Sequence, residues 1–111
     1  MRVLLDACVP YRLSQELTEH QVRTTPQMGW ADLDDGPLLD AMTGLFDALV
    51  TVDKSLPKQQ RVSTRSFGVV VLRAKTNRLI DLLPLVPALL VPALHRTLDK
   101  LRPGEVYELG D

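Results

Sequence analysis

Short apolar runs punctuate this chain, and segments with helical spacing separate them. Residues 3–5 and 48–52 are two such runs, and each ends in an aspartate, Asp6 and Asp53. Residues 69–72 are rich in valine and form the most strand-like segment. Runs of this length without polar alternation predict strands buried on both faces. Two weaker strands are predicted at 21–24 and, at an edge of the sheet, at 105–109.

The segments between these runs predict helices. Leucines at i, i+4 spacing predict a helix over 10–17, and a second helix begins at Asp34 or Asp35 and weakens near Gly44. A third helix is predicted from Asn77. Residues 54–67 lack an apolar period and predict a loop. Prolines are expected to break the region after the third helix into short pieces: Pro84, Pro87 and Pro92.

Strands that alternate with helices indicate βαβ units and therefore an α/β fold. We expect a small parallel sheet of about four strands with flanking helices on both faces. The chain has 111 residues, of which 45% are hydrophobic and 24% charged. This length and composition predict a single packed domain over 1–111.

Three aspartates are placed to meet at one edge of this sheet. Asp6 and Asp53 follow strands, and Asp34-Asp35 stand at a helix start. Ligand sites in parallel sheets lie beyond the carboxyl ends of the strands. Clustered carboxylates repel one another unless a cation neutralises them, and hard oxygen ligands suit Mg²⁺ or Mn²⁺. The alternative is structural, because an aspartate at such a position often caps the next helix.

Positive charge is concentrated beside these aspartates, although the net charge of the chain is only −1. No acidic residue occurs between Asp53 and Asp81, and this stretch holds Lys54, Lys58, Arg61, Arg65, Arg73, Lys75 and Arg78. Such a segment indicates contact with a phosphate backbone, with Lys54, Arg61, Arg65, Arg73, Lys75 and Arg78 as the candidate nucleic-acid ligands. A solvated loop face, or a site for an acidic segment of a partner protein, is the alternative.

Other features predict the environment of the chain. The single cysteine, Cys8, excludes an internal disulfide and favours a reducing, cytoplasmic compartment; we expect it to be a small buried hydrophobe. The opening MRVLLD reaches a charge too soon for a signal peptide, since only three apolar residues lie between Arg2 and Asp6. The longest apolar stretch, residues 82–94, is too short and too rich in proline to span a membrane. The two histidines show no metal-ligand spacing and are expected at the surface.

Several of these segments together resemble the short bacterial PIN-like family, whose members often lie in toxin–antitoxin loci. The resemblance runs from Met1 to about Val106. It rests on the opening MRVLLD, the following Val9-Pro10, the segment LVTVDK at 49–54 with Leu56-Pro57, and VVVLRA at 69–74. The "Leu-Leu-Asp" opening and the "Thr-x-Asp" strand end are specific only in combination.

The resemblance implies a Rossmann-like three-layer fold and a function. PIN-domain ribonucleases, which include the VapC-type toxins, cleave RNA with Mg²⁺ or Mn²⁺ held by acidic residues. By position, Asp6, Asp35 and Asp53 match the acidic residues that hold the metal and carry catalysis. The chain departs from the family in two ways: it has no counterpart of the glutamate from an intervening helix, and Ala7 stands where relatives often have an acidic residue. Both departures leave less negative charge to hold a metal.

The leading hypothesis is that the chain is a metal-dependent ribonuclease and the toxin half of a toxin–antitoxin pair. Its expected partners are RNA and an antitoxin protein, and a homodimer is a possible assembly. The alternative is a catalytically weak or inactive PIN-like module that binds nucleic acid or regulates. A third hypothesis is an interaction domain whose carboxylates are helix caps. Metal titration separates the first from the other two, and RNA binding separates the second from the third.

Overall fold

The computed structural model describes residues 1–9, 11–17, 19–73 and 91–110. Its centre is a five-stranded sheet in the order β2-β1-β3-β4-β5, in which every neighbouring pair is parallel. The strands are β1 (Arg2–Leu5), β2 (Gln21–Thr24), β3 (Ala48–Thr51), β4 (Gly68–Arg73) and β5 (Val106–Gly110). The α/β class and the parallel sheet are confirmed, with five strands in place of about four. The fifth is the terminal edge strand, which pairs with β4 along its whole length.

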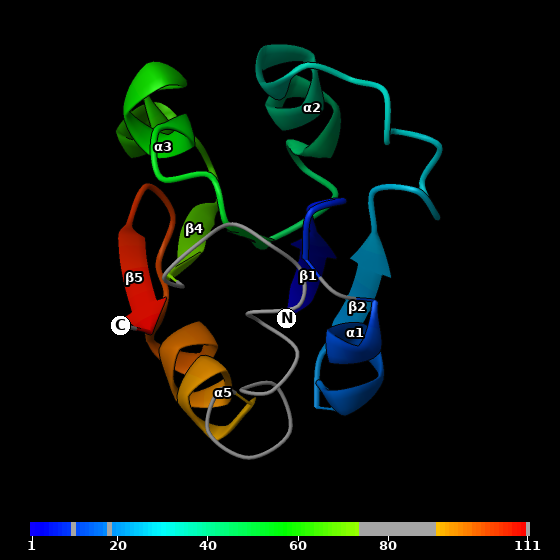
Figure 1. The fold of residues 1–111 in the computed structure, drawn as a ribbon. Helices are drawn as coiled ribbons and strands as arrows, with labels where there is room; N and C mark the ends of the chain where they lie inside the picture. The colour runs from blue at the N-terminus through cyan, green and yellow to red at the C-terminus, as the bar shows by residue number, and fades with distance from the viewer. Residues whose placement is uncertain (10, 18, 74–90, 111) are drawn as a thin grey trace.

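Helices cover both faces of the sheet, so the molecule has three layers. Figure 1 shows α2 and α3 on one face and α1 and α5 on the other. Their bounds are α1 (Arg12–Glu16), α2 (Asp35–Met42), α3 (Leu56–Gln59) and α5 (Val91–Lys100), with a 3₁₀ turn, η1 (Val62–Thr64), after α3. Within the described ranges, no helix is both long enough and apolar enough to cross a membrane.

Alternate residues of the buried strands point into two separate cores. Val3, Leu5 and Val50 face α1 and α5, whereas Leu4 and Leu49 face α2 and α3. All five side chains are fully buried. Because the central strands are covered on both faces, they need apolar residues at every position, which is why they read as continuous runs in the sequence.

The register of the sheet brings the ends of β1 and β3 together. Leu5 is paired with Val50, and the backbone N–H of Asp6 donates to the carbonyl of Val50 at 2.9 Å. Asp6 and Asp53 therefore follow neighbouring strands at the same edge of the sheet. This confirms the placement expected from the sequence.

Local structure differs from expectation in several places. Residues 54–67 were expected as a loop but include α3 and η1, because Leu56 and Val62 are buried against the sheet. Pro92 lies in the first turn of α5, where a proline costs no hydrogen bond, and so does not break a helix. Cys8 is exposed and not buried. The predicted helix from Asn77, with Pro84 and Pro87, lies outside the described residues.

Candidate active site at the carboxyl edge of the sheet

The hydroxyl of Thr51 joins the two strand-end aspartates. It donates a hydrogen bond to Asp6 Oδ2 at 2.8 Å and accepts one from the backbone N–H of Asp53 at 3.2 Å. Thr51 itself is completely buried at the end of β3. The remaining oxygen of Asp6, Oδ1, accepts the backbone N–H of Ala7 at 2.8 Å. The orientation of Asp6 is thus set by two donors, one from each of two chain segments.

Asp53 is held by the turn that follows it. Its Oδ1 accepts both the backbone N–H of Ser55, at 3.0 Å, and the Ser55 hydroxyl, at 2.7 Å. Such a local turn is typical of aspartate just after a strand, since the short carboxylate reaches the backbone two residues on. Asp53 therefore stabilises the turn that leads into α3, although it does not cap that helix, whose N-cap residue is Ser55 and which has no side-chain cap hydrogen bond.

Asp35 comes to the same place from α2. It lies in the first turn of that helix, and the preceding Asp34 supplies the carbonyl that accepts the N–H of Leu38 at 2.9 Å. The pKa of Asp35 is raised, first by burial, then by the negative charges of Asp53 and Asp6, and further by a hydrogen bond with Asp53. Asp6 and Asp53 thus lie close enough to Asp35 for their charges to disfavour its ionisation.

The chemistry of this group fits a hard divalent cation in charge and in donor type. A cation would relieve the repulsion that raises the pKa of Asp35, and carboxylate oxygens are the ligands that Mg²⁺ and Mn²⁺ prefer. Asp6 and Asp53 retain acceptor capacity beyond the bonds they already make, because an ionised carboxylate has about four lone-pair sites. Across the described part of the chain, however, no group of three or more His, Cys, Asp or Glu side chains is arranged so that it could hold a metal ion.

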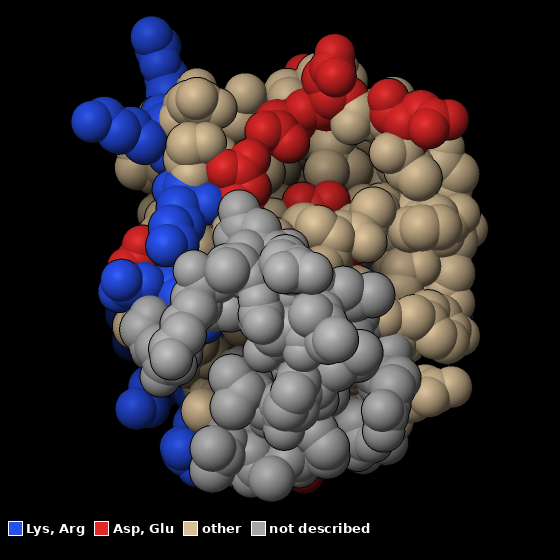
Figure 2. Space-filling model, viewed as in Figure 1, with Lys and Arg blue, Asp and Glu red and all other residues tan. Residues whose placement is uncertain are grey.

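The predicted phosphate ligands divide into two sets. Lys54 and Arg61 are exposed and form no ion pair with any residue in the described ranges. Arg65 pairs with Asp40 at 2.6 Å, and Arg73 pairs with Glu108 at 3.4 Å. Lys75 and Arg78 lie outside the described residues. In Figure 2, acidic side chains form a band over the region of α2, and lysines and arginines run along the left margin.

Arg65 lies toward the opposite edge of the sheet from Asp53. It precedes β4, so the chain there is returning to the opposite edge of the sheet from Asp53. Its partner Asp40 is five residues along α2 from Asp35, which is about 7.5 Å of helix axis. Arg73, by contrast, ends β4 at the same edge as Asp53. Closeness to Asp53 in the sequence therefore corresponds to closeness in the sheet for Arg73 but not for Arg65.

Thr51 and Ser55 were missed as site residues by sequence reasoning. Thr51 was named only as part of the "Thr-x-Asp" strand end, and its own polar role became visible only when the register put Asp6 beside it. The available signal was a hydroxyl residue two positions before a strand-end aspartate. Also missed was a pocket of about 270 Å³ that opens beside Asp6 at the ends of β1 and β2.

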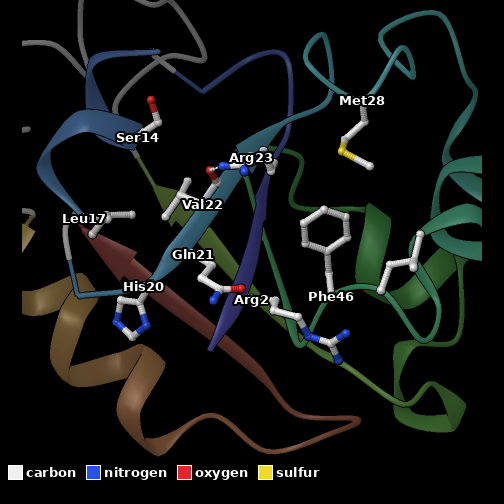
Figure 3. Close-up of a pocket in the computed structure, with 10 residues that line it drawn as sticks. Arg2, Ser14, Leu17, His20, Gln21, Val22, Arg23, Met28 and Phe46 are labelled. Atoms are coloured by element: carbon white, nitrogen blue, oxygen red, sulfur yellow. Dashed lines mark hydrogen bonds between the residues drawn. The ribbon is translucent and has the colours of Figure 1, made fainter.

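A larger groove, of about 660 Å³, lies elsewhere, along the edge strand β2. Figure 3 shows Phe46 and Met28 on one side of this strand and Leu17 and His20 on the other. No carboxylate lines it. The hydroxyl of Ser14, which also lines it, donates to the carbonyl of Tyr11 and not to His20, so the groove offers no serine–histidine pair.

Comparison of the chain with protein-family models, with curated proteins and with solved structures found no match.

Proposed function

We propose that this chain is a divalent-cation-dependent ribonuclease of the PIN-like kind that cleaves RNA at the carboxyl edge of its sheet. The observation that carries the proposal is the meeting of the ends of β1 and β3, where Thr51 is bonded to the carboxylate of Asp6 and to the backbone of Asp53. Asp35, in the first turn of α2, lies near enough for their charges to add to the effect of burial on its pKa. The three carboxylates come from β1, the start of α2 and the end of β3, so three separate elements supply one cluster. The role as the toxin of a toxin–antitoxin pair rests on the sequence resemblance.

Each residue has a distinct task in this proposal. A divalent cation at the three carboxylates would activate water and offset the charge that develops on a phosphodiester. Thr51 keeps Asp6 and Asp53 in fixed orientations through its two hydrogen bonds. Lys54 directly follows Asp53, so its ammonium is placed to hold a neighbouring phosphate of the RNA.

A second candidate function is a nucleic-acid-binding module with little or no catalysis. The hydrogen bonds that already occupy Asp6 and Asp53 favour it, because these carboxylates are stabilised without a cation. Ala7 adds to this, since no extra carboxylate stands beside Asp6.

Mn²⁺ titration calorimetry on wild type and Asp53→Asn, together with cleavage of a labelled single-stranded RNA, tests the proposal. We expect wild type to bind Mn²⁺ and Asp53→Asn to lose both binding and cleavage. An asparagine oxygen can still accept the bonds from Ser55, so the turn is preserved. Without metal, the variant should be at least as stable as wild type, because one of three repelling charges is gone.

Asp99→Asn is the matched control, since Asp99 lies on α5 within electrostatic reach of His20 and not of the carboxylate cluster. It should leave Mn²⁺ binding unchanged. Equal Mn²⁺ binding by wild type and Asp53→Asn would show that the three carboxylates are not the ligands. RNA binding without Mn²⁺ binding or cleavage would establish the second candidate in place of the nuclease.

A further inference from the structure

The pocket beside Asp6 has the size of a site for one small ring system. Its volume of about 270 Å³ is just below the roughly 300 Å³ at which pockets for drug-sized ligands begin. Asp6 forms part of its wall, and Thr24 at the end of β2 forms another part. A molecule in this pocket would therefore touch the carboxylate cluster directly.

The lining combines apolar surfaces with an aromatic ring. Val9 and Pro26 contribute apolar wall, and Tyr11 is 55% exposed although it also lines the pocket. A half-exposed aromatic ring at a pocket wall is a stacking surface for a planar ligand, and every nucleobase has a face that can use it.

Gln27 supplies the polar group, and its orientation is fixed. Its side-chain Oε1 accepts the backbone N–H of Thr24 at 2.8 Å, and its own backbone N–H donates to the Thr24 hydroxyl at 3.2 Å. The amide oxygen is thus already used by the protein. The Nε2 amino group forms no hydrogen bond with the described residues, so the side chain presents donors to a ligand.

We propose that this pocket receives one base of the RNA, the base next to the phosphate that lies at Asp6, and that it prefers uracil to adenine. The proposal rests on the proposed function. The oxygen of the Gln27 amide is held by the N–H of Thr24, so the amino group is the part of this side chain that has no bond to the described residues. The remaining donors match the carbonyl oxygens of uracil, and a single pyrimidine ring suits the limited volume.

Nuclear magnetic resonance titration of the full chain with uridine 5′-monophosphate, adenosine 5′-monophosphate and ribose 5-phosphate tests this, without Mn²⁺. Uridine monophosphate should shift the Gln27 side-chain amide and Tyr11 ring signals. Adenosine monophosphate should bind several-fold more weakly, and ribose 5-phosphate should not shift these signals. Tyr11→Ala should weaken binding of the uridine nucleotide roughly tenfold, whereas Tyr11→Phe should retain it.

Two further variants make the result specific. Gln27→Glu keeps an acceptor for the N–H of Thr24 but removes the donors, so the preference for uridine over adenosine nucleotide should disappear. Tyr107→Ala, at an exposed tyrosine of β5 on the far side of the sheet, should change nothing.

Equal shifts with ribose 5-phosphate, or unchanged binding in Tyr11→Ala, would overturn the base pocket. The two proposals fail separately: cleavage of RNA without these shifts removes the pocket alone, and the shifts without Mn²⁺-dependent cleavage remove the nuclease alone. If neither cleavage nor these shifts are observed, both proposals are overturned.

Discussion

One buried hydroxyl organises the strand-end carboxylates. Thr51 is 0% exposed. Its hydroxyl donates a hydrogen bond to Asp6 and accepts one from the backbone N–H of Asp53. The Sγ of Cys8 lies 4.0 Å from the same oxygen. A group with this many partners in a buried position is costly to remove, because its partners lose bonds that water cannot fully replace.

We expect Thr51→Val to lower the free energy of unfolding by about 1–3 kcal/mol, since valine fills the same space but can neither donate nor accept. Thr51→Ser should recover most of this loss. Urea denaturation of the three proteins measures it. Equal stability of Thr51→Val and wild type would show that the hydroxyl does not stabilise the aspartates.

Asp35 is the member of the cluster whose pKa is raised. Burial and the charges of Asp53 and Asp6 raise its pKa above the ordinary value of 3.8. A carboxyl whose pKa is raised by folding binds its proton more tightly in the folded state, so its ionisation lowers stability as pH rises above that ordinary value. Its position in the first turn of α2 acts in the opposite direction, because a negative charge there is favourable.

Asp35→Asn should therefore raise the free energy of unfolding at pH 7 by a few tenths of a kcal/mol, after allowance for the lost charge at the helix start. At pH 3, where the carboxyl is protonated in both states, the gain should vanish. Thermal unfolding at the two pH values measures the difference. A variant less stable than wild type at pH 7 would show that the helix interaction exceeds the repulsion.

Contacts between distant elements were the part of the fold least visible in the sequence. A Cβ atom at Gly68 would lie 2.5 Å from Leu101 Cγ, so the start of β4 and the end of α5 can pack only around a glycine. His20, before β2, stacks on His95 of α5 with ring centroids 5.3 Å apart. Both histidines are half-buried, which corrects the expectation of surface histidines.

The histidine stack makes stability depend on pH. The pKa of His20 is lowered, first by burial and then by the positive N-terminus and His95, while Asp99 and Glu19 act in the opposite direction. The unfolded state therefore takes up the proton at a higher pH than the folded state. Stability from this group is present above the unfolded pKa of about 6.5 and is lost as pH falls below it.

His20→Gln should accordingly show a flatter decline of stability between pH 7.5 and pH 5 than wild type. The size of the effect is bounded by about 1.4 kcal/mol per pH unit for one proton. Urea midpoints at several pH values give both slopes. Parallel slopes for the two proteins would show that His20 titrates normally in the fold.

Charges are segregated on the face of the molecule seen in Figure 2, where acidic and basic side chains gather in different parts. Ion pairs neutralise part of the basic set, since Arg65 and Arg73 each have a carboxylate partner. Lys54 and Arg61 have none within the described ranges and so are the stronger candidates for phosphate contact.

RNA binding should weaken steeply with salt. Replacing both Lys54 and Arg61 with alanine should reduce the slope of log K against log salt concentration by about 1.4, because each phosphate contact with a single strand contributes about 0.7. Arg65→Ala is the matched control and should leave the slope unchanged, because its guanidinium is engaged with Asp40. Filter binding at several salt concentrations measures the slopes. If wild type does not retain RNA at low salt, these residues do not bind RNA, and the alternative that they bind an acidic segment of a partner protein stands.

The sequence by itself determined the class of fold and the edge at which the site lies. Apolar runs such as residues 3–5 and 48–52 are local signals, because a strand buried on both faces needs apolar residues throughout. The positions of Asp6 and Asp53 after such runs then follow from the geometry of parallel sheets.

Only the tertiary structure decided which groups meet. The bond from Thr51 to Asp6 depends on the pairing of β1 with β3, and the stack of His20 on His95 depends on where α5 packs. The ion pair of Arg65 with Asp40 joins α2 to the segment before β4 in the same way. Each of these contacts spans 25 or more residues, and local periodicity has no information on pairs so far apart along the chain.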